Sequence, residues 1–232
     1  MNILLIGYGK MGHIIEDIAL QRDHKIASII DVNDSFDKIN NKEIDVAIDF
    51  TTPNAVLTNM QECFKRNIPL VVGTTGWYDN LDSIKQQVEK DNLAFVYSSN
   101  FAIGVMLFRK LNVFLAKMMN NYASYTPSIT EIHHIHKLDA PSGTAITLAN
   151  EMLENYDKVQ KWDKGTELHA GNMPINSVRK GEEFGTHIVA YDSEYDAIEI
   201  THTAKSRKGL ALGAVMAAEF IQNKKGFYKF DL

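Results

Sequence analysis

Short aliphatic runs alternate with helical patterns through roughly the first hundred residues. The runs are Ile3–Ile6, Ile26–Ile30, Val46–Phe50, Leu70–Val72 and Leu93–Tyr97. Continuous apolar runs of this length are typical of strands buried on both faces of a parallel sheet. Helical spacing follows them, as at Ile14, Ile15 and Ile18. The alternation predicts an α/β fold with a Rossmann-type doubly wound parallel sheet, in which ligands bind beyond the carboxyl ends of the strands.

The pattern changes after Phe101. The expected elements are a helix over Val105–Met119, a strand over Ile129–Lys137, a helix over Thr144–Glu154, strands between Glu183 and Thr203, and an Ala-rich helix over Leu210–Ile221. Tyr156–Ser177 has the least pattern and is expected to be loop. We therefore expect an inserted α+β domain with a mixed sheet over residues 104–208. Residues 1–103 and 209–232 then form the other domain, with the last helix returning to it.

The composition is that of a soluble globular protein. Of 232 residues, 45% are apolar and 23% are charged, and the formal net charge is −5, so no basic surface for nucleic acid is expected. No apolar run is long enough to span a membrane, and the N-terminal run is expected to be a strand rather than a signal peptide. The single cysteine, Cys63, excludes a disulfide framework and is expected in a helix core. These features favour a cytoplasmic protein.

A glycine-rich turn follows the first strand. Gly7-Tyr8-Gly9-Lys10-Met11-Gly12 has the spacing G-x-G-x-x-G and opens an amphipathic helix. Such glycines let the backbone turn tightly and approach a pyrophosphate, while the helix N-terminus offers free N–H groups to the phosphates. Since strand, turn and helix occur together, the segment predicts a dinucleotide site rather than a glycine turn without a ligand.

Asp31 ends the second strand about 24 residues after Gly7. A carboxylate at this place accepts hydrogen bonds from ribose hydroxyls and repels a 2′-phosphate. Val32, which follows, offers no charge to neutralise such a phosphate. We therefore expect NADH to be preferred, with NADPH as the alternative, because Lys10 is a cation within the turn.

The segment from Glu131 to Ala145 is the richest in chemistry. It reads Glu-Ile-His-His-Ile-His-Lys-Leu-Asp-Ala-Pro-Ser-Gly-Thr-Ala. On a straight strand His133 and Lys137 share one face and His134 lies on the other. Ser142 is expected to cap the next helix, whose first N–H groups, at Gly143 and Thr144, form an anion site. Histidine, lysine and a helix N-terminus together suit a carboxylate-bearing substrate that needs proton transfer.

Three other interpretations of this segment compete. Surface histidines beside a structural cap are the simplest. A metal site is the second, since His134 and His136 have a ligand spacing, but no third ligand is evident and Lys137 opposes a cation. Hydrolysis by Ser142 is the third, and its surroundings do not resemble a nucleophile elbow. We predict no metal.

Five ordered motifs resemble those of the dihydrodipicolinate reductase family, along nearly the whole chain. The segment from Glu131 to Ala145 is similar to the family's signature. The other four motifs are Gly73-Thr74-Thr75-Gly76, Ser98-Ser99-Asn100-Phe101, Arg179-x-Gly181 with Gly185-x-His187, and His202-x-Ala204-x-Ser206-Arg207 followed by Gly213-Ala214.

The resemblance implies roles for individual residues. His133 is implied to be the acid/base residue, and Lys137 a proton donor that also holds substrate charge. His134, Gly143 and Thr144 are implied to contact a substrate carboxylate. The residues implied to bind the cofactor are Gly7, Tyr8, Gly9, Lys10, Met11, Gly12, Asp31, Gly73, Thr74, Thr75, Ser98, Ser99, Asn100 and Phe101.

The resemblance further implies the reduction of 4-hydroxy-tetrahydrodipicolinate in lysine and diaminopimelate synthesis, and a homotetramer. Residues 1–103 and 209–232 would then bind the dinucleotide, and 104–208 the small dicarboxylate substrate and the neighbouring subunits. The chain departs from the family at Lys10, Val32 and Leu210, where many members have Arg, a basic residue and Phe. Another NAD(P)-dependent dehydrogenase of a small dicarboxylate or amino acid, or a non-catalytic nucleotide-binding sensor, remains as the alternative.

Overall fold

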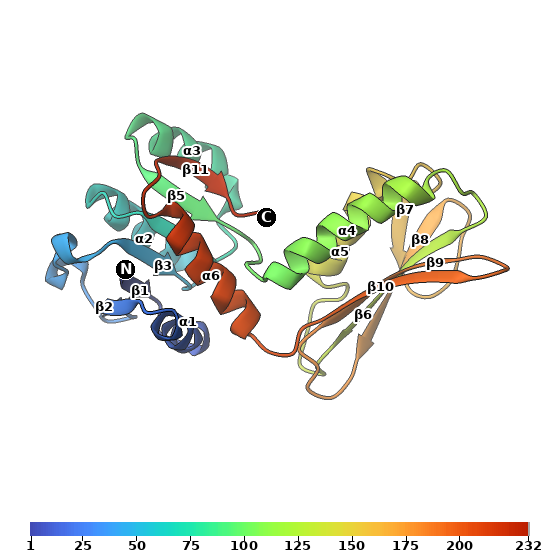
Figure 1. The fold of residues 1–232 in the computed structure, drawn as a ribbon, viewed down its shortest axis with the longest axis horizontal. Coiled ribbons are helices and arrows are strands. Elements are labelled where there is room, and N and C mark those ends of the chain that lie inside the picture. Colours follow the sequence, from blue (N-terminus) through green and yellow to red (C-terminus); the bar gives the residue numbers. More distant parts are fainter. Residues whose placement is uncertain (232) are drawn as a thin grey trace. The chain divides into compact units, whose positions relative to one another are not determined.

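The computed structural model describes residues 1–231 and divides them into two compact units (Figure 1). The first unit comprises Met1–Ile103 together with the segment from Arg207 onward, and the second comprises Gly104–Ser206. Each unit has its own sheet.

The first unit is built on a six-stranded sheet with the order β11-β5-β4-β3-β1-β2. The strands are β1 (Asn2–Ile6), β2 (Lys25–Ile30), β3 (Val46–Asp49), β4 (Leu70–Val72), β5 (Ala94–Tyr97) and β11 (Gly226–Lys229). Every pairing in this sheet is parallel. The prediction of a Rossmann-type doubly wound parallel sheet is therefore confirmed, and only β11 was not expected.

Four helices and three short 3₁₀ turns connect these strands. The helices are α1 (Lys10–Gln21), α2 (Pro53–Lys65), α3 (Leu81–Lys90) and α6 (Lys208–Ile221), and the turns are η1 (Phe36–Lys38), η2 (Asn41–Glu43) and η3 (Tyr78–Asn80). Helix α2 buries Val56, Met60 and Cys63 against the sheet, which confirms that Cys63 is a core residue. Burial raises the pKa of its thiol far above the ordinary value.

Helix α6 packs on the central strands of the first unit. It contacts β3, β4, β5 and α1, as expected of a C-terminal helix that returns to this sheet. Its buried positions are small, and at Gly213 the helix lies directly on the backbone of Phe101: a Cβ built on Gly213 would lie 1.7 Å from the Phe101 carbonyl oxygen. Glu219 of α6 also accepts hydrogen bonds from Arg22, at 2.8 and 2.9 Å, just after α1.

The second unit is a mixed five-stranded sheet covered by two helices on one face. Its strands are β6 (Thr126–His133), β7 (Lys161–Lys164), β8 (Asn172–Arg179), β9 (Thr186–Asp192) and β10 (Ala197–Thr203), in the order β10-β9-β6-β8-β7. Strand β8 runs parallel to β6 and β7, whereas β9 is antiparallel to β6 and β10. The helices are α4 (Ile103–Met119) and α5 (Gly143–Leu153).

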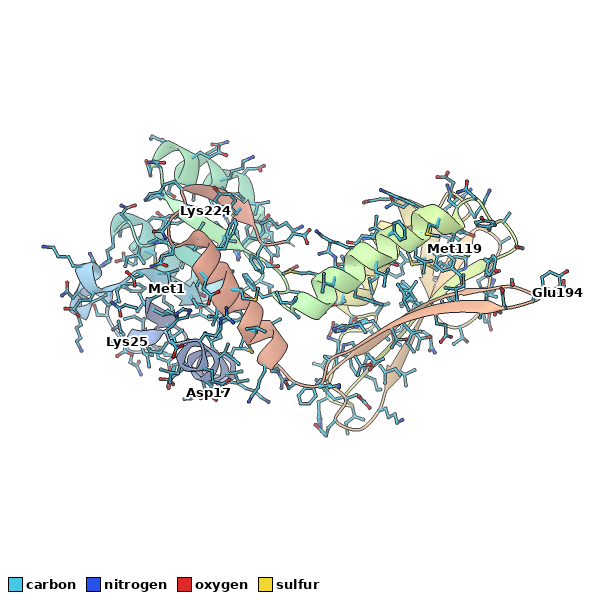
Figure 2. All side chains as sticks on the ribbon, in the orientation of Figure 1. Met1, Asp17, Lys25, Met119, Glu194 and Lys224 are labelled. Carbon is cyan, nitrogen blue, oxygen red and sulfur yellow. The ribbon has the colours of Figure 1, made fainter. Side chains whose placement is uncertain are left out.

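Alternate residues of β6, β8 and β9 form the core of this unit. Ile129, Ile175 and Val189 lie side by side in the register and are buried under α4 and α5. Strands β9 and β10 form a hairpin whose turn includes Glu194, which Figure 2 labels, and in which the Ser193 amide donates to the Asp196 carbonyl at 2.9 Å. An inserted α+β unit with a mixed sheet was predicted and is confirmed.

Two predictions of secondary structure in the second unit were wrong. The strand expected to reach Lys137 ends at His133, because the chain turns there: the His134 amide donates to the Glu183 carbonyl and the Lys137 amide to the His134 carbonyl. The stretch 156–177, expected to be loop, contains β7 and most of β8. The buried run of β8 is only three residues long, Met173-Pro174-Ile175, and it has a proline at its centre and polar residues on both sides, which gives a weak strand signal. Along residues 1–231, no helix has the length and apolar character needed to cross a bilayer.

Candidate active site

The glycine-rich turn joins β1 to α1 in the geometry that a phosphate needs. Gly7 has φ +88°, and a Cβ there would lie 2.4 Å from the Phe50 carbonyl oxygen, while a Cβ on Gly12 would lie 2.4 Å from the Gly7 carbonyl oxygen. A Cβ on Gly9 would meet nothing within 4 Å. Gly9 is the N-cap of α1 and makes no side-chain cap hydrogen bond, and no acid lies in the first turn. The turn therefore presents free amides and open space, which fits a pyrophosphate.

A second loop borders the same space. A cavity of about 280 Å³ in the first unit is lined by Gly9, Lys10, Met11, Phe50, Thr51, Pro53, Gly73, Thr74 and Thr75. The structure thus brings six of the predicted cofactor residues together. Of the lining residues, Phe50, Thr51 and Pro53 were not among the predicted contacts, although the sequence places them at the end of a strand.

Asp49 joins the loops that follow β3 and β4 by hydrogen bonds, and it was not among the residues predicted to form the site. It is fully buried and accepts from Thr74 Oγ1 at 2.7 Å, Thr51 Oγ1 at 2.8 Å and Asn59 Nδ2 at 2.8 Å. Burial raises the pKa of Asp49, although these hydrogen bonds and one from the Thr51 amide act in the opposite direction. An acidic residue within the otherwise apolar run Val46–Phe50 was the signal that could have identified it.

The segment after β5 is held by its own hydrogen bonds. Ser98 Oγ donates to the Asn100 carbonyl at 2.9 Å, and Asn100 Oδ1 accepts from the Ala102 amide at 2.9 Å. Ser99 is exposed, whereas the Phe101 ring is buried against Phe50 and Phe230. Contact of this segment with a cofactor stays a prediction.

Tyr8 and Asp31 lie at the margins of the turn. The half-buried Tyr8 donates its hydroxyl hydrogen bond to Glu16 and packs its ring on His13, with centroids 4.0 Å apart. Asp31 is exposed beyond β2, and its amide donates to Asp34 Oδ2 at 3.0 Å. Val32 is 92% exposed. Two carboxylates and an uncharged side chain therefore lie together at the end of β2.

In the second unit His133 is the last residue of β6. It is buried, and its Nδ1 contacts Oε2 of the fully buried Glu131, two positions earlier on the same face. Glu131 Oε1 in turn accepts from Arg179 Nη1 of the neighbouring strand β8 at 3.0 Å. Glu131 and Arg179 were part of the sequence motifs without an assigned role.

Lys137 lies in the turn that follows. Its Nζ pairs with Asp139 Oδ1 at 2.8 Å, and hydrogen bonds from Lys137 hold the pKa of the Asp139 carboxyl below its usual range. Because β6 ends at His133, the chain is free to bring Lys137 round without strand alternation. His134, at the start of this turn, is half-buried and packs its ring 6.1 Å from that of His136.

Ser142 is the N-cap of α5, as predicted. Its Oγ accepts from the Ala145 amide at 3.2 Å and lies 3.1 Å from His187 Nε2. A Cβ on Gly143 would meet nothing within 4 Å, so the space beside the first residue of α5 is open. The ring of His187 meets that of His133 edge-on, with centroids 5.2 Å apart. The signature segment thus folds into one cluster of proton-carrying groups beside a helix N-terminus.

One set of side chains in this cluster has the geometry of metal ligands. Ligand atoms of Glu131, His133 and His187 lie within 4.8 Å of one another. The carboxylate of Glu131 is, however, already paired with the Arg179 guanidinium and with His133. A guanidinium at the same carboxylate opposes a cation, so the donor set does not fit a metal ion.

Comparison with known proteins gives the same family for both parts of the chain. The family model of the dihydrodipicolinate reductase N-terminus matches residues 1–101, and that of the C-terminus matches residues 104–232. A 4-hydroxy-tetrahydrodipicolinate reductase of Christiangramia forsetii is 49% identical over 98% of this chain and 95% of its own. One of Thermosipho africanus is 38% identical over 99% of this chain and 96% of its own.

A solved structure shares the fold. The dipicolinate-bound dihydrodipicolinate reductase from Paenisporosarcina sp. TG-14 superposes with a TM-score of 0.78 at 24% identity, over 99% of this chain and 98% of that one. The two family models together cover almost every residue, and a relative is 49% identical over 98% of the chain. Both comparisons assign the chain to the same family. The chain belongs to the dihydrodipicolinate reductase family and is an NAD(P)H-dependent oxidoreductase.

Proposed function

We propose that this chain reduces 4-hydroxy-tetrahydrodipicolinate to tetrahydrodipicolinate with NAD(P)H, in the synthesis of lysine and diaminopimelate. The observation that carries the proposal is the folding of Glu131–Ala145 into one cluster, in which a buried imidazole, a lysine and a free helix N-terminus come from a single segment. Full-length relatives that bear the name of this activity support it. The single buried thiol of Cys63 is in line with a cytoplasmic location.

Each residue of the cluster has a chemical task in this reaction. A nicotinamide, when bound, would supply the hydride that the unsaturated ring accepts. His133 holds the proton that the substrate takes up, and the ammonium of Lys137 donates a second hydrogen bond and offsets substrate charge. His134 and the amides of Gly143 and Thr144 bind a carboxylate at the N-terminus of α5. His133→Ala should therefore lower turnover about a hundredfold or more while leaving the dissociation constant of NADH unchanged.

The first unit binds the cofactor in this proposal. Gly7, Gly9 and Gly12 let the pyrophosphate approach the amides at the start of α1, and Lys10, Met11, Gly73, Thr74 and Thr75 border the cavity beside it. Tyr8 and Ser98, Ser99, Asn100 and Phe101 complete the predicted contacts. Asp31 accepts from the ribose hydroxyls.

We propose a preference for NADH. The Asp34 carboxylate accepts from the Asp31 amide, and Val32 is exposed without a charge, so a 2′-phosphate would meet acidic side chains at this end of β2.

We also propose that the chain assembles as a homotetramer through the second unit. In the described residues of this unit, one face of the sheet has no helix, and that face presents half-buried apolar residues, including Ile132 opposite Val178, and Ala190. Leu107, Leu111, Phe114 and Met118 also repeat along α4 with exposed fractions of 55, 47, 61 and 50%. Apolar surface of this kind favours association, and closed symmetry would cover it in every copy.

The consumption of NADH and of NADPH by the purified protein tests the activity. The substrate is supplied in situ by a synthase acting on pyruvate and aspartate semialdehyde, and light scattering of the same sample gives the mass. Rapid oxidation, faster with NADH, and a mass of four chains are expected. If neither cofactor is oxidised while the synthase is active, the reductase assignment fails, and a sensor or another substrate takes its place. Equal rates with both cofactors would refute the NADH preference alone.

A further inference from the structure

A buried carboxylate lies behind the imidazole of His133. Glu131 and His133 are two positions apart on β6 and so point to the same face, where both are covered. Oε2 of Glu131 contacts Nδ1 of His133, and Glu131 has no exposed surface. Placing a carboxylate in the interior is costly unless specific partners compensate for the loss of water, so its partners indicate what the residue does.

The partners of Glu131 keep it ionised. Burial raises its pKa, but hydrogen bonds from His133, Ser177 and Arg179 act more strongly together and hold the pKa at about 2. Arg179 Nη1 donates to Oε1 at 3.0 Å, which leaves Oε2 for the imidazole. At neutral pH the group facing His133 Nδ1 is therefore a full negative charge.

Arg179 also holds the turn that contains Lys137. Its Nη2 donates to the Asp139 carbonyl at 2.6 Å and its Nε to the Lys137 carbonyl at 3.3 Å. The planar guanidinium thus binds, with separate N–H groups, the carboxylate behind His133 and the backbone on both sides of Leu138. One side chain fixes the two proposed proton-carrying residues relative to each other.

The other groups around His133 leave its Nδ1 to Glu131. His187 of β9 packs edge-on against the ring, with its Nε2 3.1 Å from Ser142 Oγ. Burial, and then the charges of His133 and Lys137, lower the pKa of His187 to about 4, so it is neutral at pH 7. The titratable groups Glu131 and His187 contact the His133 ring, and Arg179 acts on it through Glu131. Lys137 and His202 lie close enough to His187 for their charges to lower its pKa.

We propose that Glu131, held by Arg179, is the positioning residue that fixes the tautomer of His133. This inference rests on the function proposed above. A carboxylate can only accept, so Nδ1 must carry a proton and donate it to Glu131, and Nε2 becomes the nitrogen that exchanges a proton with the substrate. Nε2 lies beside Gly185, where a Cβ would approach it to 2.9 Å, and the absence of a side chain there keeps room for a reacting group.

The proton balance of the step is simple. The imidazolium releases its Nε2 proton to the substrate position that becomes basic when hydride is added, and the N–H bond of His133 breaks as the new bond to hydrogen forms. The ring is left neutral, with its remaining proton bonded to Nδ1 and donated in a hydrogen bond to the ionised Glu131. Water returns a proton to Nε2 before the next turnover. Glu131 stays ionised throughout and stabilises the protonated ring, as buried carboxylates do beside other general acids and bases.

Glu131→Gln is the sharpest test because it keeps the shape and removes the charge. Since Arg179 only donates, the amide must turn its oxygen to Arg179 and its NH₂ to His133 Nδ1, which imposes the opposite tautomer. We expect kcat to fall about a hundredfold or more, with the dissociation constant of NADH and the KM of the substrate changed less than about threefold. The alkaline limb of the kcat profile, where His133 loses its proton, should also move to lower pH in the variant. The reason is that the carboxylate of the wild type stabilises the protonated ring and the amide does not.

A matched control lies in the same unit. Glu151 of α5 pairs with Arg109 of α4, its Oε1 2.7 Å from Nε, so Glu151→Gln makes the same chemical change in an arginine pair that does not touch His133. We expect it to keep kcat within about twofold. If Glu131→Gln does not fold, the double variant Glu131→Gln/Arg179→Gln replaces the pair with two amides that can bond to each other, and the same loss of kcat is expected.

The outcomes separate the two proposals. Wild-type turnover with a Glu131→Gln rate within about threefold of it would overturn the positioning role alone. A loss of kcat of equal size in Glu151→Gln would also overturn it, since the effect would then be structural. No turnover by the wild type with either cofactor would overturn the proposed function and this inference together.

Discussion

Gly213 offers the sharpest test of how the first unit is packed. A Cβ at this position in α6 would lie 1.7 Å from the Phe101 carbonyl oxygen, about half of an ordinary contact distance, and a backbone atom cannot rotate away. Gly213→Ala must therefore shift α6 or the segment Ser98–Phe101. Overpacking of this kind costs about 1–3 kcal/mol, whereas replacing a helical glycine by alanine contributes about 1 kcal/mol in the other direction.

Gly209, in the first turn of the same helix, is the matched control. It is exposed, and a Cβ there would meet nothing within 4 Å, so Gly209→Ala should stabilise the unit by up to about 1 kcal/mol. For Gly213→Ala, we expect an overpacking cost in the upper part of its range, which remains about 1–2 kcal/mol after the gain in helix propensity is subtracted, so the variant should be less stable. The same substitution in one helix is thus expected to change the free energy of unfolding in opposite directions.

Urea unfolding followed by tryptophan fluorescence measures both effects. The chain has two tryptophans, and in a Trp162→Phe background the emission comes from Trp77, which is buried in the first unit. Midpoints and slopes then give the free energies of unfolding. If Gly213→Ala proved as stable as Gly209→Ala, the close contact between α6 and Phe101 would be refuted.

Three further changes have expected outcomes. In Asp49→Asn the new NH₂ group faces one of the three side chains that donate to Asp49, namely Thr51, Asn59 or Thr74, so one hydrogen bond between the two loops is lost. NADH binding, measured by fluorescence titration, should weaken about tenfold. Burial lowers the pKa of His187 from 6.5 to about 4, so the unfolded state binds a proton on this ring more readily than the folded state does. As the pH drops from about 6.5 to 4, this group should therefore lower the free energy of unfolding by roughly 3 kcal/mol. Urea titrations of the variant His187→Asn should not show that loss. Val32→Arg should raise kcat/KM for NADPH relative to NADH at least tenfold, and an unchanged ratio would exclude a 2′-phosphate site here.

The parallel sheet could be predicted because its strands are buried on both faces. Ile3–Ile6 and Leu70–Val72 are continuous apolar runs that few other structures accommodate. Strand β7 could not be predicted in the same way, because Lys161 and Asp163 place polar groups along it and its pairing with β8 supplies what the side chains do not. Strand β11 is likewise defined by its pairing with β5.

In the candidate site, too, local features could be predicted from the sequence and contacts between distant residues could not. The glycine turn and the cap at Ser142 are local, so residue spacing alone predicted them. The contact of Arg179 with Glu131 joins residues 48 positions apart, and no local pattern determines which acid a distant arginine meets. The end of β6 at His133 depends on the Glu183 carbonyl, again a distant partner, and the straight strand expected through Lys137 was wrong for that reason.

The discontinuity of the first unit has a consequence for biosynthesis. The second unit is one continuous stretch, Gly104–Ser206, so all of its strands are available as soon as that stretch has left the ribosome. The sheet of the first unit, by contrast, waits for α6 to cover β3, β4 and β5 and for β11 to pair with β5. Until then one face of its apolar central strands stays uncovered. Residues 1–103, although they are made before the second unit, therefore reach their final state after it. During synthesis the first unit therefore exposes apolar strand surface for longer than the second, which is the condition that favours aggregation of a partly folded chain.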